Sequence, residues 1–181
     1  NNLYRFIFVK KRMDIQEIIL TRRSIRDFTE KPVSEKTIKR LLEAAMYAPS
    51  ARSYQPWHFI VTKDRERLDR LSEIHPYAGM LQSATAAIMV CADRNLEPND
   101  RYNAQNAAAA TQNILLSAHE AGLGSCWLGV YPREDRMNKI SSFLQLPDNI
   151  LPVSLIALCY PAEEKEQPDR FNPQRIHYER W

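Results

Sequence analysis

Glycine is scarce in this sequence, with four in 181 residues, and neither glycine-rich phosphate-binding pattern, GxGxxG or GxxxxGK followed by Ser or Thr, is present. A Rossmann dinucleotide site and a P-loop are therefore not supported. No apolar run approaches the length of a transmembrane helix. The early apolar segment, residues 3–9, precedes a basic cluster, which reverses the order found in a secretory signal. These absences favour a cytoplasmic protein that has no membrane segment.

Cysteine and histidine are also few. The three cysteines each lie in an apolar run without a CxxC pair, and they are predicted to be buried free thiols in a reducing compartment: Cys91, Cys126 and Cys159. The four histidines are scattered and lack the spacing of metal ligands, so no metal site is expected. The 25 Lys and Arg against 22 Asp and Glu give a net charge of +3, interleaved along the chain, which does not indicate a nucleic-acid surface.

The length of the chain predicts one domain. At 181 residues and 21.1 kDa it can bury a hydrophobic core without disulfides or metals. Residues 1–12 fit no element well and are interpreted as a leader or tag-like extension. A strong helix start follows, because Asp14 and Glu17 form a capping box that Met13 and Ile18 would flank as a hydrophobic staple. The domain is therefore assigned to residues 13–181, with a first helix at about 15–20.

The rest of the domain mixes helical and strand patterns. Further helices are predicted after the N-cap residue Ser34, at 68–74, at 101–121 with Gly122 as the C-terminal cap, and around 137–144. Strands are predicted at 57–62, 85–92, 125–130 and 153–160. The inner side of the long helix is expected to carry Ala104, Ala107, Ala108, Thr111, Leu115 and Ala118.

The segment after the last strand, residues 161–181, has a different character. It is rich in proline and charge, yet it carries aromatic residues that it cannot bury against itself. We therefore expect it to wrap around another molecule, such as a partner subunit.

Three short motifs could carry chemistry. The first places three cations and a hydroxyl within five residues, a composition suited to forked hydrogen bonds on a phosphate: Arg22, Arg23, Ser24 and Arg26. A solvated turn with ordinary surface arginines fits the same residues.

The second motif is a loop between two prolines with several hydrogen-bond donors: Ser50, Arg52, Ser53 and Gln55. A simple connection with Trp57 in the core is the alternative.

The third motif, GLGSCWLG, contains three of the four glycines. Gly122 is explained by helix capping, whereas Gly124 and Gly129 suggest that the backbone closely approaches a flat ligand.

These motifs occur in a recognisable order: RRSIRDF, then APSARSYQPWHFIV, an alanine-rich helix, GLGSCWLG, and a final strand followed by a basic tail. Together they resemble the nitroreductase family of FMN enzymes, from Asp14 to the C-terminus. The resemblance implies an α+β fold with a mixed central sheet flanked by helices. It also implies an intertwined homodimer with exchanged C-terminal segments and two FMN sites at the interface.

The resemblance also implies roles for individual residues. The FMN phosphate and the polar edge of the flavin would be held by Arg22, Arg23 and Ser24, with Arg26 close by. The flavin or its ribityl chain would be reached, in part from the opposite subunit, by Ser50, Arg52, Ser53 and Gln55. The backbone near the flavin N5 would be that of Gly124, Ser125 and Cys126. The basic tail would close on the phosphate through Arg170 and Lys165.

The function implied is an FMN-dependent oxidoreductase. Hydride would pass from NADH or NADPH through bound flavin to a small acceptor such as a nitroaromatic, a quinone or an enone. A two-step, ping-pong cycle is expected, and no protein side chain need act as a nucleophile. Two alternatives remain open: a flavin-binding sensor or storage protein without turnover, and a basic interaction domain whose RRSIR segment contacts nucleic acid.

Overall fold

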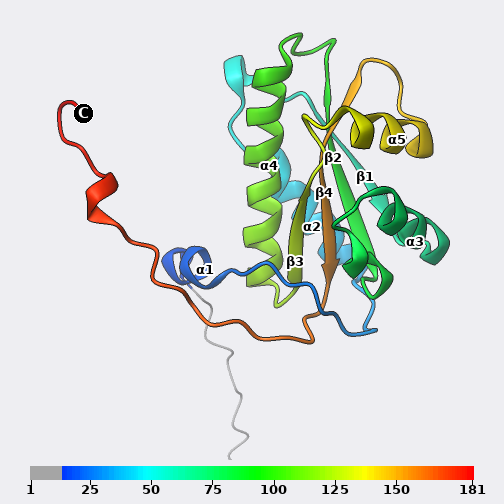
Figure 1. Ribbon diagram of the computed structural model, residues 1–181, viewed down its shortest axis with the longest axis horizontal. Coiled ribbons are helices and arrows are strands. Elements are labelled where there is room, and N and C mark those ends of the chain that lie inside the picture. The colour runs from blue at the N-terminus through cyan, green and yellow to red at the C-terminus, as the bar shows by residue number, and fades with distance from the viewer. Residues whose placement is uncertain (1–13) are drawn as a thin grey trace, which may run out of the picture.

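The computed structural model describes residues 14–181 and has three layers (Figure 1). A four-stranded sheet in the order β1-β2-β4-β3 forms the middle layer. Its strands are β1 (Trp57–Thr62), β2 (Ala86–Asp93), β3 (Gly124–Gly129) and β4 (Ile150–Cys159). One face is covered by α2 (Glu35–Met46) and α4 (Asp100–Glu120), and the other by α3 (Arg65–Ile74) and α5 (Glu134–Leu144). The chain is therefore an α+β protein, as predicted.

The expectation of a mixed sheet was wrong for this chain. All three pairs of strands within the described residues are antiparallel. The strands joined through α4, β2 and β3, do run in the same direction, but β4 lies between them and pairs antiparallel with each. Among residues 14–181, parallel pairing is found at one isolated bridge, between Ser24 and Ser125.

The predicted caps of the first two helices are confirmed. The Asp14 side chain accepts a hydrogen bond from the backbone N–H of Glu17 at 2.8 Å, and α1 (Ile15–Thr21) follows. Ser34 likewise accepts from the Thr37 N–H and begins α2. The predicted staple partner Met13 and the extension at 1–12 lie outside the described residues.

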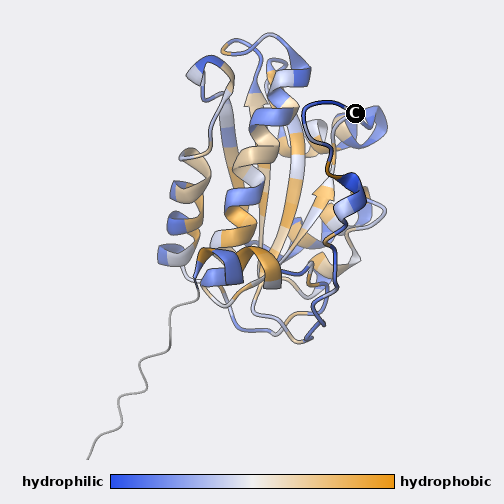
Figure 2. Ribbon diagram, turned by 90° about the vertical axis from the view of Figure 1, so that its left-hand side faces the viewer, coloured by the Kyte–Doolittle hydropathy of each residue, from blue (hydrophilic) through white to orange (hydrophobic). Residues whose placement is uncertain are grey.

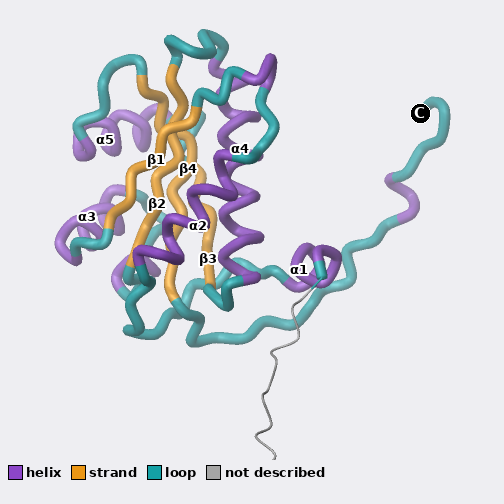
Figure 3. Tube along the Cα trace, turned by 180° about the vertical axis from the view of Figure 1, so that it is seen from behind, coloured by secondary structure: helices purple, strands orange, loops and turns teal. Residues whose placement is uncertain are grey.

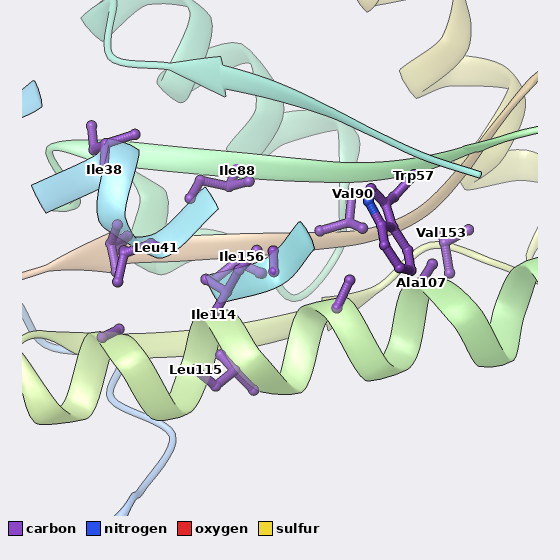
Figure 4. Packing of buried hydrophobic residues seen from close by; sticks show 14 of the residues in the cluster. Ile38, Leu41, Trp57, Ile88, Val90, Ala107, Ile114, Leu115, Val153 and Ile156 are labelled. Atoms are coloured by element: carbon purple, nitrogen blue, oxygen red, sulfur yellow. The ribbon is translucent and has the colours of Figure 1, made fainter. Parts of the chain in front are cut away.

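The long helix α4 lies one position away from the prediction, and its buried face differs more. Ala104 and Ala108 are half-buried, whereas Asn103 and Asn106 are buried. The asparagines tolerate burial because Asn103 donates to the Glu97 carbonyl at 2.7 Å and Asn106 accepts from the Ala51 N–H at 2.9 Å. The other buried residues of α4 are Ala107, Ala110, Thr111, Ile114, Leu115 and Ala118. Figure 4 labels three of them, Ala107, Ile114 and Leu115, within the core cluster between α4 and the sheet.

Alternation along the strands supplies the two cores. In β2, Ile88 and Val90 face α4, while Met89 and Cys91 face α3 and α5. A β-bulge between Val90 and Cys91 shifts the phase of β4. Along β4, the residues that face α4 are therefore Leu151 and Val153 before the bulge, and Ile156 and Leu158 after it.

The three cysteines are buried free thiols, as predicted. Burial raises the pKa of Cys91 to about 12.

In Figure 2 the strands carry most of the hydrophobic colour between the helices. Within the part of the chain that is described, no helix is long and apolar enough to cross a membrane.

The tail after β4 leaves the three layers. It passes beside α1 and ends away from the sheet (Figures 1 and 3). Phe171, Tyr178 and Trp181 are 76%, 82% and 99% exposed, so the tail buries little of its aromatic surface within this chain. The described residues also form three short 3-10 helices: Ala51–Ser53, Gly79–Gln82 and Pro173–Arg175.

Candidate functional site

The residues after α1 lie along the outer edge of β3. Ser24 bridges Ser125, and the Ile25 N–H donates to the Ser125 carbonyl at 3.0 Å. The two backbones approach so closely that a Cβ atom at Gly124 would lie 2.8 Å from Cγ2 of Ile25. The position of Arg22, just before this contact, is therefore set by β3.

The start of the tail fixes the same segment from the other side. Lys165 Nζ donates to the Ser24 carbonyl at 2.8 Å, and Arg23 Nε donates to the Glu166 carbonyl at 3.0 Å. The structure thus brings together the first predicted motif, the GLGSC strand and the basic tail, which are far apart in the sequence.

Two cavities lie at this junction, and Arg22 and Arg23 line both. The first has a volume of about 370 Å³ and is lined by Thr21, Arg22, Arg23, Ile25, His119, Gly122, Leu123, Ser125, Pro161, Glu163, Glu164 and Lys165. The second, of about 540 Å³, is lined by Ile19, Leu20, Arg22, Arg23, Gln167, Pro168, Asp169, Arg170 and Phe171.

Arg22 and Arg23 differ in their hydrogen bonds. All three guanidinium nitrogens of Arg23 donate to backbone carbonyls, those of Leu20, Arg22 and Glu166. The half-buried side chain of Arg22 makes no hydrogen bond to any other described residue. Arg23 therefore ties the tail to α1, whereas the guanidinium of Arg22 is left for a ligand.

The electrostatics favour an anion beside Arg22. Burial, and then the neighbouring positive charges of Arg23 and Arg170, lower its pKa. The carboxylates that also line the cavities, Glu163, Glu164 and Asp169, do not cancel this effect. Glu163 is engaged by Lys165 at 3.1 Å and by the Arg26 N–H at 2.5 Å, a hydrogen bond that lowers the pKa of Glu163.

The second predicted motif forms a strained loop. Arg52, Ser53 and Gln55 have φ angles of 53°, 57° and 50°, in the left-handed region that few residues other than glycine adopt. The loop is held by Asn106, which accepts from the Ala51 N–H. Strained backbone that surrounding contacts hold in place clusters at binding sites, so this loop remains a candidate.

The loop does not reach the arginine cavities within one chain. It is fixed to Asn106 on α4, whereas the first cavity includes His119 near the end of the same helix. Thirteen residues of helix separate the two positions by about 20 Å. The two groups of predicted site residues therefore lie at opposite ends of α4.

Comparison with known proteins agrees with these features. A model of the nitroreductase family matches residues 19–76 and 75–160. The chain belongs to the nitroreductase family.

A candidate NADH dehydrogenase/NAD(P)H nitroreductase of Methanothermobacter thermautotrophicus is 47% identical over 170 residues, 94% of this chain and 89% of the relative. A crystal structure with the same description from Parabacteroides distasonis is 39% identical, with a TM-score of 0.88 over 92% of this chain and 98% of that one. A candidate nitroreductase from Desulfovibrio desulfuricans in complex with FMN is 31% identical, with a TM-score of 0.81 over 93% and 98%.

The two glycines of β3 have different surroundings within the chain. A Cβ atom at Gly124 would meet the Ile25 side chain, so close backbone packing alone accounts for this glycine, whereas a Cβ atom at Gly129 would meet nothing within 4 Å. Ser125 lines the first cavity, but the Cys126 side chain is buried. Burial raises the pKa of the Cys126 thiol although Arg26, Lys165 and Arg22 oppose this shift.

Sequence reasoning missed several residues of these regions. Thr21 and His119 line the first cavity. In the loop region, the carboxylate of buried Glu97 lies 3.8 Å from the guanidinium of Arg52, measured from Oε2 to Nη1. The position of His119 could have been inferred in part from the sequence. It lies three residues before Gly122, which caps α4, and therefore at the end of the helix that meets the segment 22–26 in the structure. Glu97 gave no such signal, because its burial depends on the fold of the loop before α4.

Proposed function

We propose that this chain is an FMN-dependent oxidoreductase that takes electrons from NADH or NADPH and delivers them to a small acceptor such as a nitroaromatic, a quinone or an enone. The observation that carries the proposal is the guanidinium of Arg22, which has no hydrogen-bond partner among residues 14–181 and lies between two cavities of a nitroreductase-family chain. The donors around it suit the phosphate of FMN, since arginine forks match phosphate oxygens. Relatives named as NAD(P)H nitroreductases and as an FMN complex support the same reading.

Each predicted site residue has a place in this proposal. Arg22 and Arg170 hold the phosphate, while Arg23 and Lys165 fix the tail that carries Arg170. Ser24 and Arg26 lie beside the polar edge of the cofactor, and the backbone of Gly124, Ser125 and Cys126 forms the adjacent wall.

The protein contributes position and charge, whereas bound FMN supplies the two-electron redox chemistry between the nicotinamide and the acceptor. Positive charge in a partly buried cavity lowers the energy of negative charge that develops beside it. No side chain of the site is needed as a nucleophile.

A homodimer would complete the site. Two copies related by a two-fold axis, with their α4 helices side by side and antiparallel, bring the loop at one end of α4 close to the arginine cavities at the other end of the partner's helix. The loop residues that would cross are Ser50, Arg52, Ser53 and Gln55. The exposed aromatic residues of the tail would be buried by the same arrangement, in which the C-terminal segments are exchanged.

Mixing two inactive variants tests this shared site. Arg22→Ala and Arg52→Ala should each impair FMN binding in the homodimer. After dissociation and random reassembly in equal amounts, about half of the dimers are mixed and each mixed dimer has one intact site, so about a quarter of the wild-type sites should recover. Recovery is measured as bound FMN per subunit. No recovery despite confirmed subunit exchange would place both arginines in a site on one chain.

The visible spectrum of the purified protein tests the function itself. Denaturation should release FMN, and anaerobic addition of NADH or NADPH to the native protein should bleach the bound flavin. A yellow protein that neither nucleotide bleaches would instead be a flavin-binding sensor or storage protein. A colourless protein that does not bind added FMN would contradict the assignment.

Steady-state kinetics test whether nicotinamide and acceptor use one pocket in turn. Double-reciprocal plots at several acceptor concentrations should be parallel, because the oxidised nicotinamide leaves before the acceptor binds. Intersecting lines would mean that both bind together.

A further inference from the structure

The side chains of Thr21 and His119 form a hydrogen bond at the wall of the first cavity. His119 Nε2 lies 2.8 Å from the Thr21 hydroxyl oxygen, which lies 2.6 Å from the Glu17 carbonyl oxygen. A carbonyl can only accept, so the single hydroxyl hydrogen of Thr21 points to Glu17. The hydroxyl must then accept from His119, which fixes the hydrogen of the neutral imidazole on Nε2.

The other ring nitrogen remains for a ligand. In the neutral ring Nδ1 carries no hydrogen, and no hydrogen bond joins it to another residue of the described chain. His119 lines the cavity together with Arg22 and Lys165. A group that enters this cavity therefore meets a histidine whose orientation is set by Thr21 and whose free nitrogen can take up a proton.

The charges around His119 come from three parts of the fold. Arg22 and Arg23 follow α1, Glu17 lies within α1, and the tail contributes Lys165, Glu163 and Glu164 to the cavity wall. Burial, and then the positive charges of Arg22 and Arg23, lower the pKa of His119, while Glu17 opposes them. With no anion in the cavity the imidazole is therefore neutral at pH 7.

We propose that His119 is a further phosphate-binding residue, which takes up one proton from solvent on Nδ1 when FMN binds and, as the imidazolium, donates a hydrogen bond from Nδ1–H to a phosphate oxygen. The inference rests on the proposed function and adds a residue and a pH dependence to it. The reason is local: a phosphate dianion offsets the charges of Arg22 and Arg23 and adds a direct acceptor, both of which favour the imidazolium form.

The sign of the pH effect follows from linkage. Binding of FMN raises the pKa of His119 above its value in the free protein. The contribution of His119 to FMN affinity is therefore complete at pH values below the pKa of His119 in the free protein. This contribution is lost as pH rises through the pKa of His119 in the complex. Between those two values the affinity for FMN falls by up to about tenfold per pH unit. The phosphate of free FMN, with a second pKa of about 6, is already mostly dianionic at pH 7 and does not mask the effect above that pH.

Proton uptake measures the effect directly. FMN is titrated calorimetrically at pH 7 into the flavin-free full chain in buffers of different ionisation enthalpy. The wild type should take up protons on binding FMN, up to about one per site. Riboflavin, which has the same ring without the phosphate, should cause almost none. His119→Gln keeps an N–H for Thr21 but cannot titrate, so it should bind FMN with almost no proton uptake.

The outcomes separate this inference from the proposed function. Equal uptake by wild type and His119→Gln, or equal uptake with FMN and riboflavin, would overturn the role of His119. Binding of both flavins without uptake would overturn it as well and leave the function intact. If neither flavin bound, the proposed function would fail and the inference with it.

Nitrogen NMR of the wild type gives a second test that needs no variant. The His119 ring should change from the Nε2–H form to the doubly protonated form when FMN is added at pH 7. A ring that keeps its single Nε2 hydrogen in the FMN complex would exclude the proposal.

Discussion

Replacing Arg22 by alanine is expected to weaken FMN binding by about 1.5–3 kcal/mol, which is roughly a 10- to 150-fold increase in Kd. This guanidinium lines both cavities, is half-buried, and has no hydrogen-bond partner among residues 14–181. It should therefore make charge-assisted hydrogen bonds to the phosphate, and the alanine variant loses them. Quenching of FMN fluorescence gives the Kd.

Two comparisons sharpen this test. Arg67→Ala removes an exposed arginine on α3, far from the cavities, and should leave the Kd unchanged. Riboflavin should bind Arg22→Ala and the wild type about equally, because the lost contact is to the phosphate. An unchanged FMN affinity in Arg22→Ala would remove the assignment of the cavities to the cofactor phosphate.

Gly124→Ala is expected to lower the free energy of unfolding by about 1–3 kcal/mol, the usual range for overpacking. The new Cβ would lie 2.8 Å from Ile25 Cγ2 and 2.9 Å from Ile25 Cβ. Because Cβ is fixed to the backbone, a rotamer change of Ile25 cannot relieve the second contact, and the segment around Arg22 must move away from β3. Denaturant unfolding measures the loss, and FMN affinity should fall with it.

Gly129→Ala provides the matched control on the same strand. Its Cβ would meet no atom within 4 Å, so the free energy of unfolding should change by no more than about 0.5 kcal/mol. In addition, Gly124→Ala should cost less stability in an Ile25→Ala background than in the wild type, since that change removes the clashing Cγ1 and Cγ2 atoms while Cβ remains. Equal destabilisation by both glycine substitutions would show that close approach to Ile25 is not the cause.

Features that depend on a few neighbouring residues were predictable from the sequence. The caps at Asp14 and Ser34 are hydrogen bonds to residues three positions away. Gly122 ends α4 in the left-handed region, with a φ of 76°, as its place after the alanine-rich helix indicated. The apolar runs likewise predicted the four strands, because the middle layer of a three-layer fold is buried on both faces.

Other features were settled by contacts between distant parts of the chain. Asn103 and Asn106 were not among the residues predicted on the inner side of the long helix, yet both are buried. Their partners are Glu97 and Ala51, and the second of these is 55 residues away. In the same way, nothing in the run at 153–160 indicates that β4 lies between β2 and β3, and this placement made the expected mixed sheet antiparallel.

The sequence by itself determined the elements, the family resemblance and the residue types suited to a phosphate, because each is written in local composition and order. Only the tertiary structure decided which of those residues are available. It tied Arg23 to backbone carbonyls, left the Arg22 guanidinium without a hydrogen-bond partner among the described residues, and brought His119 to the same cavity. It also fixed the loop that carries Arg52 to Asn106, which lies about 20 Å along α4 from His119. The physical reason is that hydrogen bonds and burial between distant segments exist only once the chain has folded.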